Sequence, residues 1–213
     1  MTFSPSWINS CDRCYRKKDY QKYLEQDRIA LGIKKKSINN ILLEFLNPNY
    51  IYKFQKSLRK LEYYKNCNKS IIYKLYYFYL VYKFKKLSLK LGFSIPLNVF
   101  GPGLSIVHYG TIIVNAKAKV GANCRIHPST CIGASGGLSK APQIGDNCYI
   151  APGVKIYGDI TLGNNIITAA NTAIGKSFLE SNILIGGVPA IKIKEIDVSK
   201  IIKHITNDSI SKQ

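Results

Sequence analysis

Large aliphatic side chains recur at every sixth position between residues 108 and 174. Branched aliphatic residues fill ten of the twelve positions divisible by six: Val114, Val120, Ile126, Ile132, Leu138, Ile144, Ile150, Ile156, Leu162 and Ile174. His108 and Thr168 are the two exceptions. A period of six fits neither an α-helix, which repeats about every 3.6 residues, nor the two-residue alternation of a half-buried strand. The pattern predicts a β-helix of hexapeptide repeats, with three short strands and three turns in each coil of about 18 residues.

The remaining positions of the repeat are compatible with the same coil. Small or β-branched residues follow the aliphatic residues by four positions, as at Ala118, Cys124 and Thr130. We therefore expect each aliphatic side chain in a narrow core and each small residue where the chain turns. Residues 133–143 (GASGGLSKAPQ) are too polar and too rich in glycine for a coil face, so they predict a loop that projects from the β-helix.

Residues 10–92 follow a helical pattern instead. Toward their end, apolar residues come at intervals of three and four, which predicts one buried face of an α-helix: Ile71, Leu75, Phe78, Val81, Phe84, Leu87 and Leu91. Asn47-Pro48-Asn49 predicts a break between two helices. Gly92 and Pro96 predict the end of the last helix.

The two patterns divide the chain into parts of unequal charge. The formal net charge is +19; residues 1–94 hold 20 Lys and Arg against 6 Asp and Glu, and residues 95–213 hold 11 against 6. With 46% hydrophobic residues, the chain is not expected to be disordered. We predict an α+β protein with a basic α-helical region over 1–94, a β-helix over 95–195 and a C-terminal tail over 196–213.

The sequence also predicts where the protein acts. No secretory signal is expected, because Met1–Trp7 is short and polar. The most apolar run, Ile71–Tyr82, contains Lys74 and is too short to span a bilayer. These features predict a soluble cytoplasmic protein with reduced cysteines. Cys11 and Cys14 form a lone C-x-x-C pair, and the three histidines are not spaced to converge, so no metal site is predicted.

The segment Tyr63–Lys90 interleaves tyrosine and lysine and leaves several interpretations open. Such a segment could bind nucleic acid or an anionic membrane surface. A packed helix with a solvated lysine face is the alternative, and this interpretation is favoured. We therefore expect no nucleic acid partner, while a peripheral contact with the inner face of the membrane stays open.

Several segments of the β-helix together resemble the hexapeptide-repeat acyltransferases, in particular the serine acetyltransferase-like branch. The resemblance extends over about residues 95–195 and depends on residues 103–111 (GLSIVHYGT), 120–123 (VGAN), 132–133 (IG), 144–147 (IGDN) and 186–190 (GGVPA). It implies a left-handed parallel β-helix, a homotrimer that could pair into a dimer of trimers, acetyl-CoA as the acetyl donor, and active sites between neighbouring subunits.

His108 matches the catalytic histidine of that family. Acyl transfer from a thioester to a hydroxyl needs a base that takes the hydroxyl proton, and a neutral imidazole can do so near pH 7. His127 follows by one coil plus one residue and should lie close to His108. It could contact the acceptor, orient His108, or be a solvated histidine of a turn. Tyr109 and His127 are the candidate residues for binding the acceptor.

The resemblance also implies where the donor binds. Gly133 and Ala134 match the site of the thioester end, where backbone amides of a glycine-rich turn can hold an oxyanion. The full set of candidate acetyl-CoA contacts is Gly133, Ala134, Ala170, Gly186, Gly187, Pro189, Ala190 and Lys192. Lys192 is included because an ammonium group can pair with a phosphate of CoA.

Three departures from the serine acetyltransferase pattern affect the expected acceptor. Val107 stands where those enzymes have an acidic residue, Phe93 is the nearest equivalent of a second acidic residue, and residues 133–143 contain no histidine. We therefore predict an O-acetyltransferase that modifies a sugar of a cell-surface polysaccharide (capsule, O-antigen or exopolysaccharide). One alternative is a serine O-acetyltransferase of cysteine biosynthesis. The other is a non-catalytic β-helix scaffold whose basic helices bind a membrane or nucleic acid.

Overall fold

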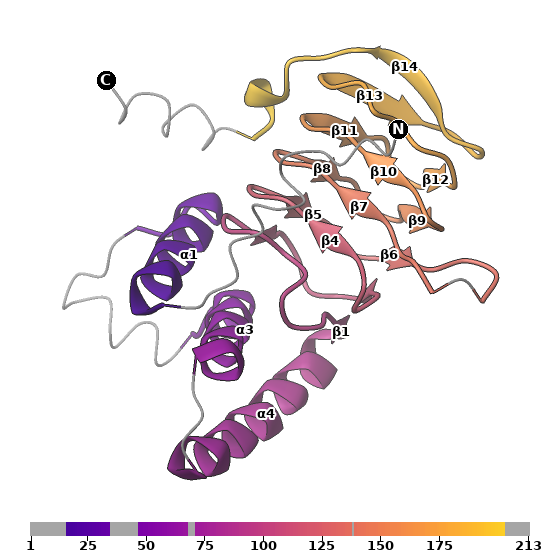
Figure 1. Cartoon of the computed structure of the whole chain (residues 1–213). Coiled ribbons are helices and arrows are strands. Elements are labelled where there is room, and N and C mark those ends of the chain that lie inside the picture. The colour runs from indigo at the N-terminus through magenta and orange to yellow at the C-terminus, as the bar shows by residue number, and fades with distance from the viewer. Residues whose placement is uncertain (1–15, 35–46, 68–70, 138, 203–213) are drawn as a thin grey trace.

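The computed structural model describes residues 16–34, 47–67, 71–137 and 139–202, which form three helices followed by a β-helix (Figure 1). The helices are α1 (Lys17–Ala30), α3 (Tyr50–Cys67) and α4 (Ile71–Leu91). Asn49 ends the predicted break, and its side-chain Oδ1 accepts a hydrogen bond from the backbone N–H of Tyr52 (2.9 Å) at the start of α3. The Cys11–Cys14 pair lies outside the described residues.

The strands form three parallel sheets, joined to an antiparallel last strand. Sheet A contains β1 (Phe93–Ser94), β3 (Ile112–Val114), β6 (Thr130–Gly133), β9 (Lys155–Tyr157) and β12 (Ala173–Ile174). Sheet B contains β4 (Lys119–Val120), β7 (Gln143–Ile144) and β10 (Thr161–Leu162). Sheet C contains β2 (Ser105–Ile106), β5 (Arg125–Ile126), β8 (Tyr149–Ile150), β11 (Ile166–Thr168), β13 (Ile183–Gly186) and β14 (Ile191–Glu195). Up to β13, consecutive strands fall on different sheets, so the chain winds into a parallel β-helix, and β14 then folds back beside β13.

The six-residue period is the inward register of this β-helix. Partner residues in successive coils lie 18 positions apart, as in the pairs Ile112–Thr130 and Ile144–Leu162. The aliphatic residues at the predicted positions are buried wherever the structure describes them. Thr168, one of the two exceptions, also faces inward, and its Oγ1 accepts a hydrogen bond from the backbone N–H of Ala151 (2.9 Å).

His108, the other exception, does not occupy an inward position, so its place in the predicted register is wrong. Ile106 pairs with Ile126, 20 residues later, which means that the turn between β2 and β3 holds two extra residues. His108 lies in that turn and is exposed.

The loop predicted at residues 133–143 connects β6 and β7, although its first and last residues, Gly133 and Gln143, belong to those strands (Figure 1). Across it, the pair Val120–Ile144 is 24 residues apart, so the loop adds six residues and leaves the six-residue phase unchanged.

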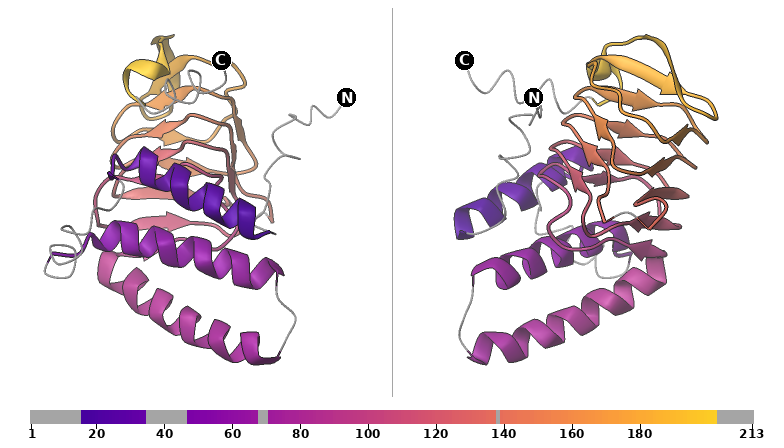
Figure 2. Two further views of the ribbon diagram at one scale, coloured as in Figure 1. Left: turned by 90° about the vertical axis from the view of Figure 1, so that its left-hand side faces the viewer. Right: turned by 45° about the vertical axis from the view of Figure 1, so that its right-hand side comes forward.

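The N-terminal helices pack on the first coil rather than forming a separate core. Phe54 and Leu58 of α3 are fully buried and belong to the same apolar cluster as Val99 and Leu104. Figure 2 shows α1, α3 and α4 stacked at one end of the β-helix, with α4 farthest from the C-terminal coils. The division at residue 95 therefore remains an interpretation of the sequence, because the apolar core crosses it.

A buried ionic network fixes α1 and α3 to the first coil. Arg59 donates hydrogen bonds to the carboxylates of Asp27 (2.9 Å) and Glu62 (3.0 Å) and to the carbonyls of Phe100 (2.9 Å) and Gly101 (2.6 Å). Asp27 in turn accepts from the backbone N–H groups of residues 103 and 104, both at 2.9 Å. The open end of the β-helix thus finds its hydrogen-bond partners in helical side chains.

Only part of the face predicted for α4 is buried. Of the predicted residues, Leu91 is buried and Phe84 and Leu87 are half-buried, whereas Leu75 is 72% exposed and Phe78 is 66% exposed. The prediction of a buried stripe is therefore wrong at Leu75 and Phe78, which no described part of the chain covers.

Candidate active site

His108 and His127 lie side by side at the corner where sheet C passes into sheet A. His108 lies in the turn between β2 and β3, and His127 lies in the turn between β5 and β6, one coil further on. Their ring centroids are 6.3 Å apart at an interplanar angle of 61°. The predicted closeness of the two histidines is confirmed.

His127 is not a solvated residue of a turn, so that alternative is wrong. Its side chain is 9% exposed, and its ring lies 5.0 Å from the ring of Tyr149 between centroids. The buried Nε2 has no hydrogen-bond partner among the described residues. Burial of the ring, together with the smaller effect of the nearby charges of Arg125 and His108, lowers the pKa of His127 to about 4. The ring beside His108 is therefore neutral at pH 7.

Most of the residues predicted to contact acetyl-CoA lie along this same corner, in the coils nearer the C-terminus. The backbone N–H of Ala169 donates to the carbonyl of Ile185 (2.8 Å), and that of Ala173 donates to the carbonyl of Gly187 (3.1 Å). These bonds bring Ala170 next to the turn that holds Gly186, Gly187, Pro189 and Ala190. Gly187 and Pro189 are exposed in this turn, while Gly186 and Ala190 are buried.

Gly133 and Ala134 lie at a different corner of the β-helix from the two histidines. Gly133 is the last residue of β6, at the opposite end of that strand from His127, where sheet A passes into sheet B. A Cβ atom at Gly133 would meet nothing nearer than the sulfur of Cys131 at 3.9 Å, so the space beside this backbone is open. A single chain does not bring Gly133 together with His108.

Lys192 and Tyr109 are not arranged as a binding site within one chain. The ammonium group of Lys192 forms ion pairs with Glu180 and, at 3.7 Å, with Glu195. Tyr109 is 73% exposed beside His108. Lys192 would have to leave its carboxylate partners to bind a phosphate.

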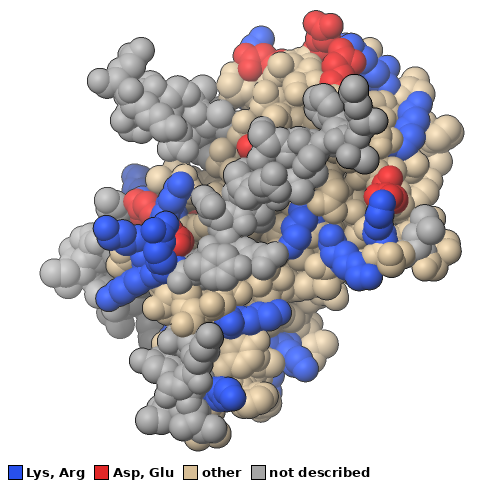
Figure 3. Space-filling model, viewed as in Figure 1, with Lys and Arg blue, Asp and Glu red and all other residues tan. Residues whose placement is uncertain are grey.

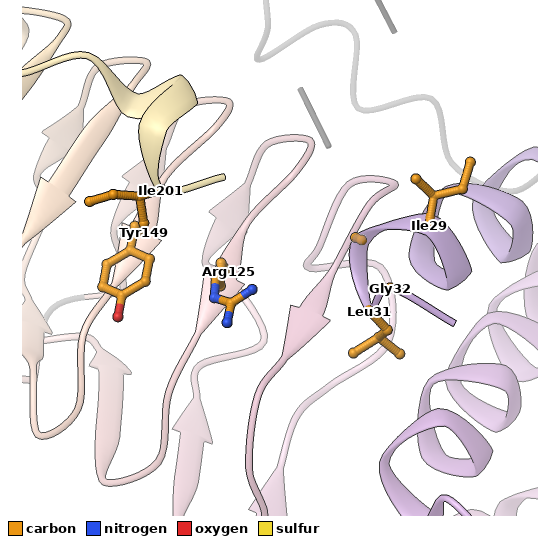
Figure 4. Close-up of a pocket in the computed structure, with 7 residues that line it drawn as sticks. Ile29, Leu31, Gly32, Arg125, Tyr149 and Ile201 are labelled. Carbon is orange, nitrogen blue, oxygen red and sulfur yellow. The ribbon is translucent and has the colours of Figure 1, made fainter. Parts of the chain in front are cut away.

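A pocket of about 470 Å³ lies on the outer face of sheet C, next to Tyr149 (Figure 4). Three distant parts of the chain line it: residues 29–32 at the end of α1, Ile201, and the outward side chains of Arg125 and Tyr149. Figure 4 shows Arg125 between Tyr149 and the end of α1. No hydrogen bond or ion pair links the Arg125 guanidinium to any described residue, so it can bind a carboxylate or phosphate group.

Sequence reasoning did not identify Arg125 or Tyr149. Each directly precedes an inward aliphatic residue, and they are register partners in β5 and β8. The six-residue period therefore placed both on the outer face of one sheet, but it did not reveal that α1 and Ile201 would enclose them. Within the described part of the chain, no group of three or more His, Cys, Asp or Glu could hold a metal ion.

Known sequences match the β-helix. A family model described as bacterial transferase hexapeptide (six repeats) matches residues 141–176. A serine acetyltransferase of Staphylococcus xylosus is 30% identical over 102 residues, which are 47% of this chain and 47% of that protein. A serine acetyltransferase of Mycobacterium tuberculosis (strain ATCC 25618 / H37Rv) is 29% identical over 93 residues, which are 43% and 41% of the two chains. The chain thus spans about half the length of the curated relatives it matches.

Solved structures match more of the chain. A serine acetyltransferase from Brucella abortus strain S19, in complex with coenzyme A, has a TM-score of 0.62 and 23% identity, covering 85% of this chain and 70% of that one. A serine acetyltransferase of Neisseria gonorrhoeae, in complex with serine, has a TM-score of 0.59 and 20% identity, covering 84% and 70%. The similarity includes the helical N-terminal region and is consistent with a left-handed β-helix. Residues 141–176 therefore match hexapeptide transferase repeats, about half of the chain is similar in sequence to serine acetyltransferases, and the described fold is that of the hexapeptide-repeat acyltransferases.

Proposed function

We propose that the protein is an acetyl-CoA-dependent O-acetyltransferase in which His108 is the general base. The main support for this proposal is the pair of histidines at the corner where sheet C passes into sheet A, the C–A corner. His108 is exposed, where a substrate can reach it, and the buried His127 beside it is neutral. Because His127 adds no positive charge, it does not oppose the imidazolium that forms when His108 takes a proton.

The reaction is direct transfer between two bound substrates. His108 removes the proton of the acceptor hydroxyl as its oxygen attacks the thioester carbonyl of acetyl-CoA. The tetrahedral intermediate collapses by breaking the carbon–sulfur bond, the acetyl ester leaves, and the proton on His108 passes to the CoA thiolate. Backbone amides beside Gly133 and Ala134 would stabilise the oxyanion, and the open space at Gly133 supports a close approach there.

The homologues favour L-serine as the acceptor over the polysaccharide sugar that the sequence first suggested. All the curated relatives described above are serine acetyltransferases, and Arg125, whose charge acts on His127, is a cation that suits an acceptor with a carboxylate. A saccharide is the second candidate, favoured by Val107 and by the absence of histidine from residues 133–143.

We further propose a homotrimer with active sites between subunits. His108 and Gly133 lie at different corners of the β-helix, so a complete site requires the C–A corner of one subunit and the A–B corner of its neighbour. The candidate residues of a single chain supply only half of each site.

The test is His108→Ala with acetyl-CoA as donor and release of the CoA thiol as the measurement. L-serine is compared with nucleotide sugars and oligosaccharide repeat units as acceptors. Turnover should fall by about 10² to 10⁴-fold, because general base catalysis contributes that much, while CoA binding by calorimetry stays unchanged. A variant with near-normal turnover would contradict the role of His108. A folded wild-type protein that binds no CoA would favour the non-catalytic scaffold.

A further inference from the structure

Helix α4 has two apolar faces, and the described chain covers only one of them. Phe84 and Leu87 pack against the core on the covered face. The opposite face carries what we call the outer stripe, whose members are all exposed: Leu75, Phe78, Tyr79, Tyr82 and Leu89. Their spacing of three, four and seven residues aligns them along one side of the helix. The aliphatic and phenyl members are the most exposed, at 72% for Leu75, 66% for Phe78 and 83% for Leu89.

The outer stripe is bordered by positive charge. Helix α4 contains five lysines and no acidic residue: Lys74, Lys83, Lys85, Lys86 and Lys90. The ammonium groups of Lys83 and Lys86 lie 5.3 Å and 5.0 Å from the ring centroids of Tyr79 and Tyr82. Figure 3 shows lysine and arginine side chains along the helical end of the molecule.

We propose that the outer stripe of α4 binds the surface of a membrane that contains anionic lipids. Leu75, Phe78 and Leu89 would enter the boundary between headgroups and acyl chains, as the apolar face of an interfacial helix does. The lysine ammonium groups would stay at the level of the lipid phosphates on their flexible stems. Tyrosine rings suit the same boundary, because they are apolar with a polar tip.

The charge pattern distinguishes this partner from two others. A second copy of the chain would place five lysines against five lysines, with no carboxylate on either helix to pair with them. Nucleic acid would pair with the lysines but would leave exposed leucine side chains without a partner. An anionic bilayer is complementary to both the charges and the apolar side chains.

The place of α4 in the molecule permits such contact. It is the outermost helix, on the side away from the C-terminal coils (Figure 2). None of the described helices combines the length and the apolarity that crossing a bilayer requires. The binding is therefore peripheral, with the helix lying along the surface.

The test is co-sedimentation of the full chain with lipid vesicles. We expect binding to vesicles of phosphatidylcholine mixed with phosphatidylglycerol to exceed binding to phosphatidylcholine alone by about tenfold or more. Replacing Leu75, Phe78 and Leu89 together by Gln should reduce the partition coefficient by about tenfold or more, since buried apolar area drives insertion. Replacing Lys83, Lys85 and Lys86 by Gln should remove most of the preference for phosphatidylglycerol.

Matched controls separate the stripe from general charge and hydrophobicity. Removing three lysines from α1 (Lys17→Gln, Lys18→Gln, Lys22→Gln) removes the same charge elsewhere and should leave binding within about twofold. Leu179→Gln with Ile113→Gln removes exposed apolar side chains of the β-helix and should do the same. Circular dichroism checks that each variant is folded.

Three results would overturn the proposal. One is equal binding to both vesicle types, and another is a loss of binding in the α1 variant as large as in the α4 variants. The third is a wild type that does not bind vesicles, together with an oligomer that dissociates when the outer stripe is replaced. That result would make the outer stripe an interface between copies of the chain.

Discussion

At the scale of single residues, the buried ring of His127 makes the stability of the fold depend on pH. A histidine that is neutral in the folded state binds a proton more readily once the chain unfolds. The pKa of His127 is about 4 in the structure, against about 6.5 for an unperturbed histidine. Between these two pH values the unfolded state binds more protons, so His127 lowers stability as the pH falls from 6.5 to 4.

We therefore expect the wild type to lose more stability than His127→Gln when the pH falls from 7 to 4.5. The difference should be about 2 kcal/mol, because each pH unit between the two pKa values corresponds to about 1.4 kcal/mol and the effect is incomplete at either end of this pH range. Urea unfolding followed by circular dichroism at both pH values measures it. Equal losses in the two proteins would show that His127 is protonated as readily in the folded chain as in the unfolded one.

At the scale of the elements, glycine fixes the spacing between coils. Gly145 directly follows the inward Ile144, and a Cβ atom there would lie 2.6 Å from the carbonyl oxygen of Gly163 in the next coil. Side chains do not occupy such space without moving the backbone. A glycine at this point of the repeat therefore allows one coil to stack directly on another.

We expect Gly145→Ala to destabilise the fold by about 1 to 3 kcal/mol, as overpacking in a tight core does. Gly133→Ala is the matched control, because its new Cβ would have open space. It should leave the midpoint of thermal unfolding almost unchanged while weakening the binding of acetyl-CoA. Equal effects of the two substitutions on stability would contradict the close contact between coils.

The second prediction at this scale concerns the joint between α3 and the first coil. Arg59→Met removes the guanidinium and leaves Asp27 and Glu62 buried without a cation. Burial already raises the pKa of Glu62, which Arg59 opposes. Loss of one member of a buried ionic network costs about 3 to 5 kcal/mol, and we expect a loss of that size in urea unfolding.

The matched control is Lys140→Met, which removes an exposed ion pair with Asp159. Exposed pairs contribute little, so no measurable change is expected. A stable Arg59→Met protein would mean that the apolar contacts of Phe54 and Leu58 are sufficient to hold α3 in place.

The elements also show which parts of the fold can be predicted from the sequence. The six-residue period follows from a local rule that successive coils repeat, so it predicted the strands from β3 to β12, but not β13 or the antiparallel β14. The turn with His108 breaks that rule by two residues, and no local signal distinguishes it. The Arg59 network joins residues 27, 59 and 100–104, which are far apart in the sequence. The face of α4 is periodic in the sequence but is not fully packed in the fold. Both features are decided by contacts between distant segments, and the local sequence pattern holds no information about such contacts.

A ladder of asparagines is another repeat that the sequence analysis did not identify. Asn123, Asn147, Asn165 and Asn182 have φ values of 55° to 59°, and each side chain bonds to the next at 2.9 Å. Asparagine tolerates this left-handed backbone better than other residues with a side chain. The ladder was detectable as an asparagine at the same place in each coil, but its hydrogen bonds appear only once the coils are stacked.

At the scale of the whole molecule, the separation of His108 from Gly133 makes the proposed active site depend on assembly. If each site takes its base from one subunit and its oxyanion amides from the next, two different inactive subunits can restore one another. His108→Ala removes the base, and Gly133→Trp fills the open space at the end of β6. In a cyclic trimer that contains both variants, one interface of the three receives an intact His108 and an intact Gly133.

Equal amounts of the two variants, unfolded and refolded together, should therefore recover about a quarter of the wild-type activity, since three in four trimers are mixed and each has one good site in three. Each variant refolded alone should remain inactive, and light scattering should give trimers in every sample. A mixture as inactive as its components would mean that His108 and Gly133 of one active site come from the same subunit. Because His108 and Gly133 occupy different corners of one chain, that result would require the first coil or the loop after β6 to rearrange when substrates bind.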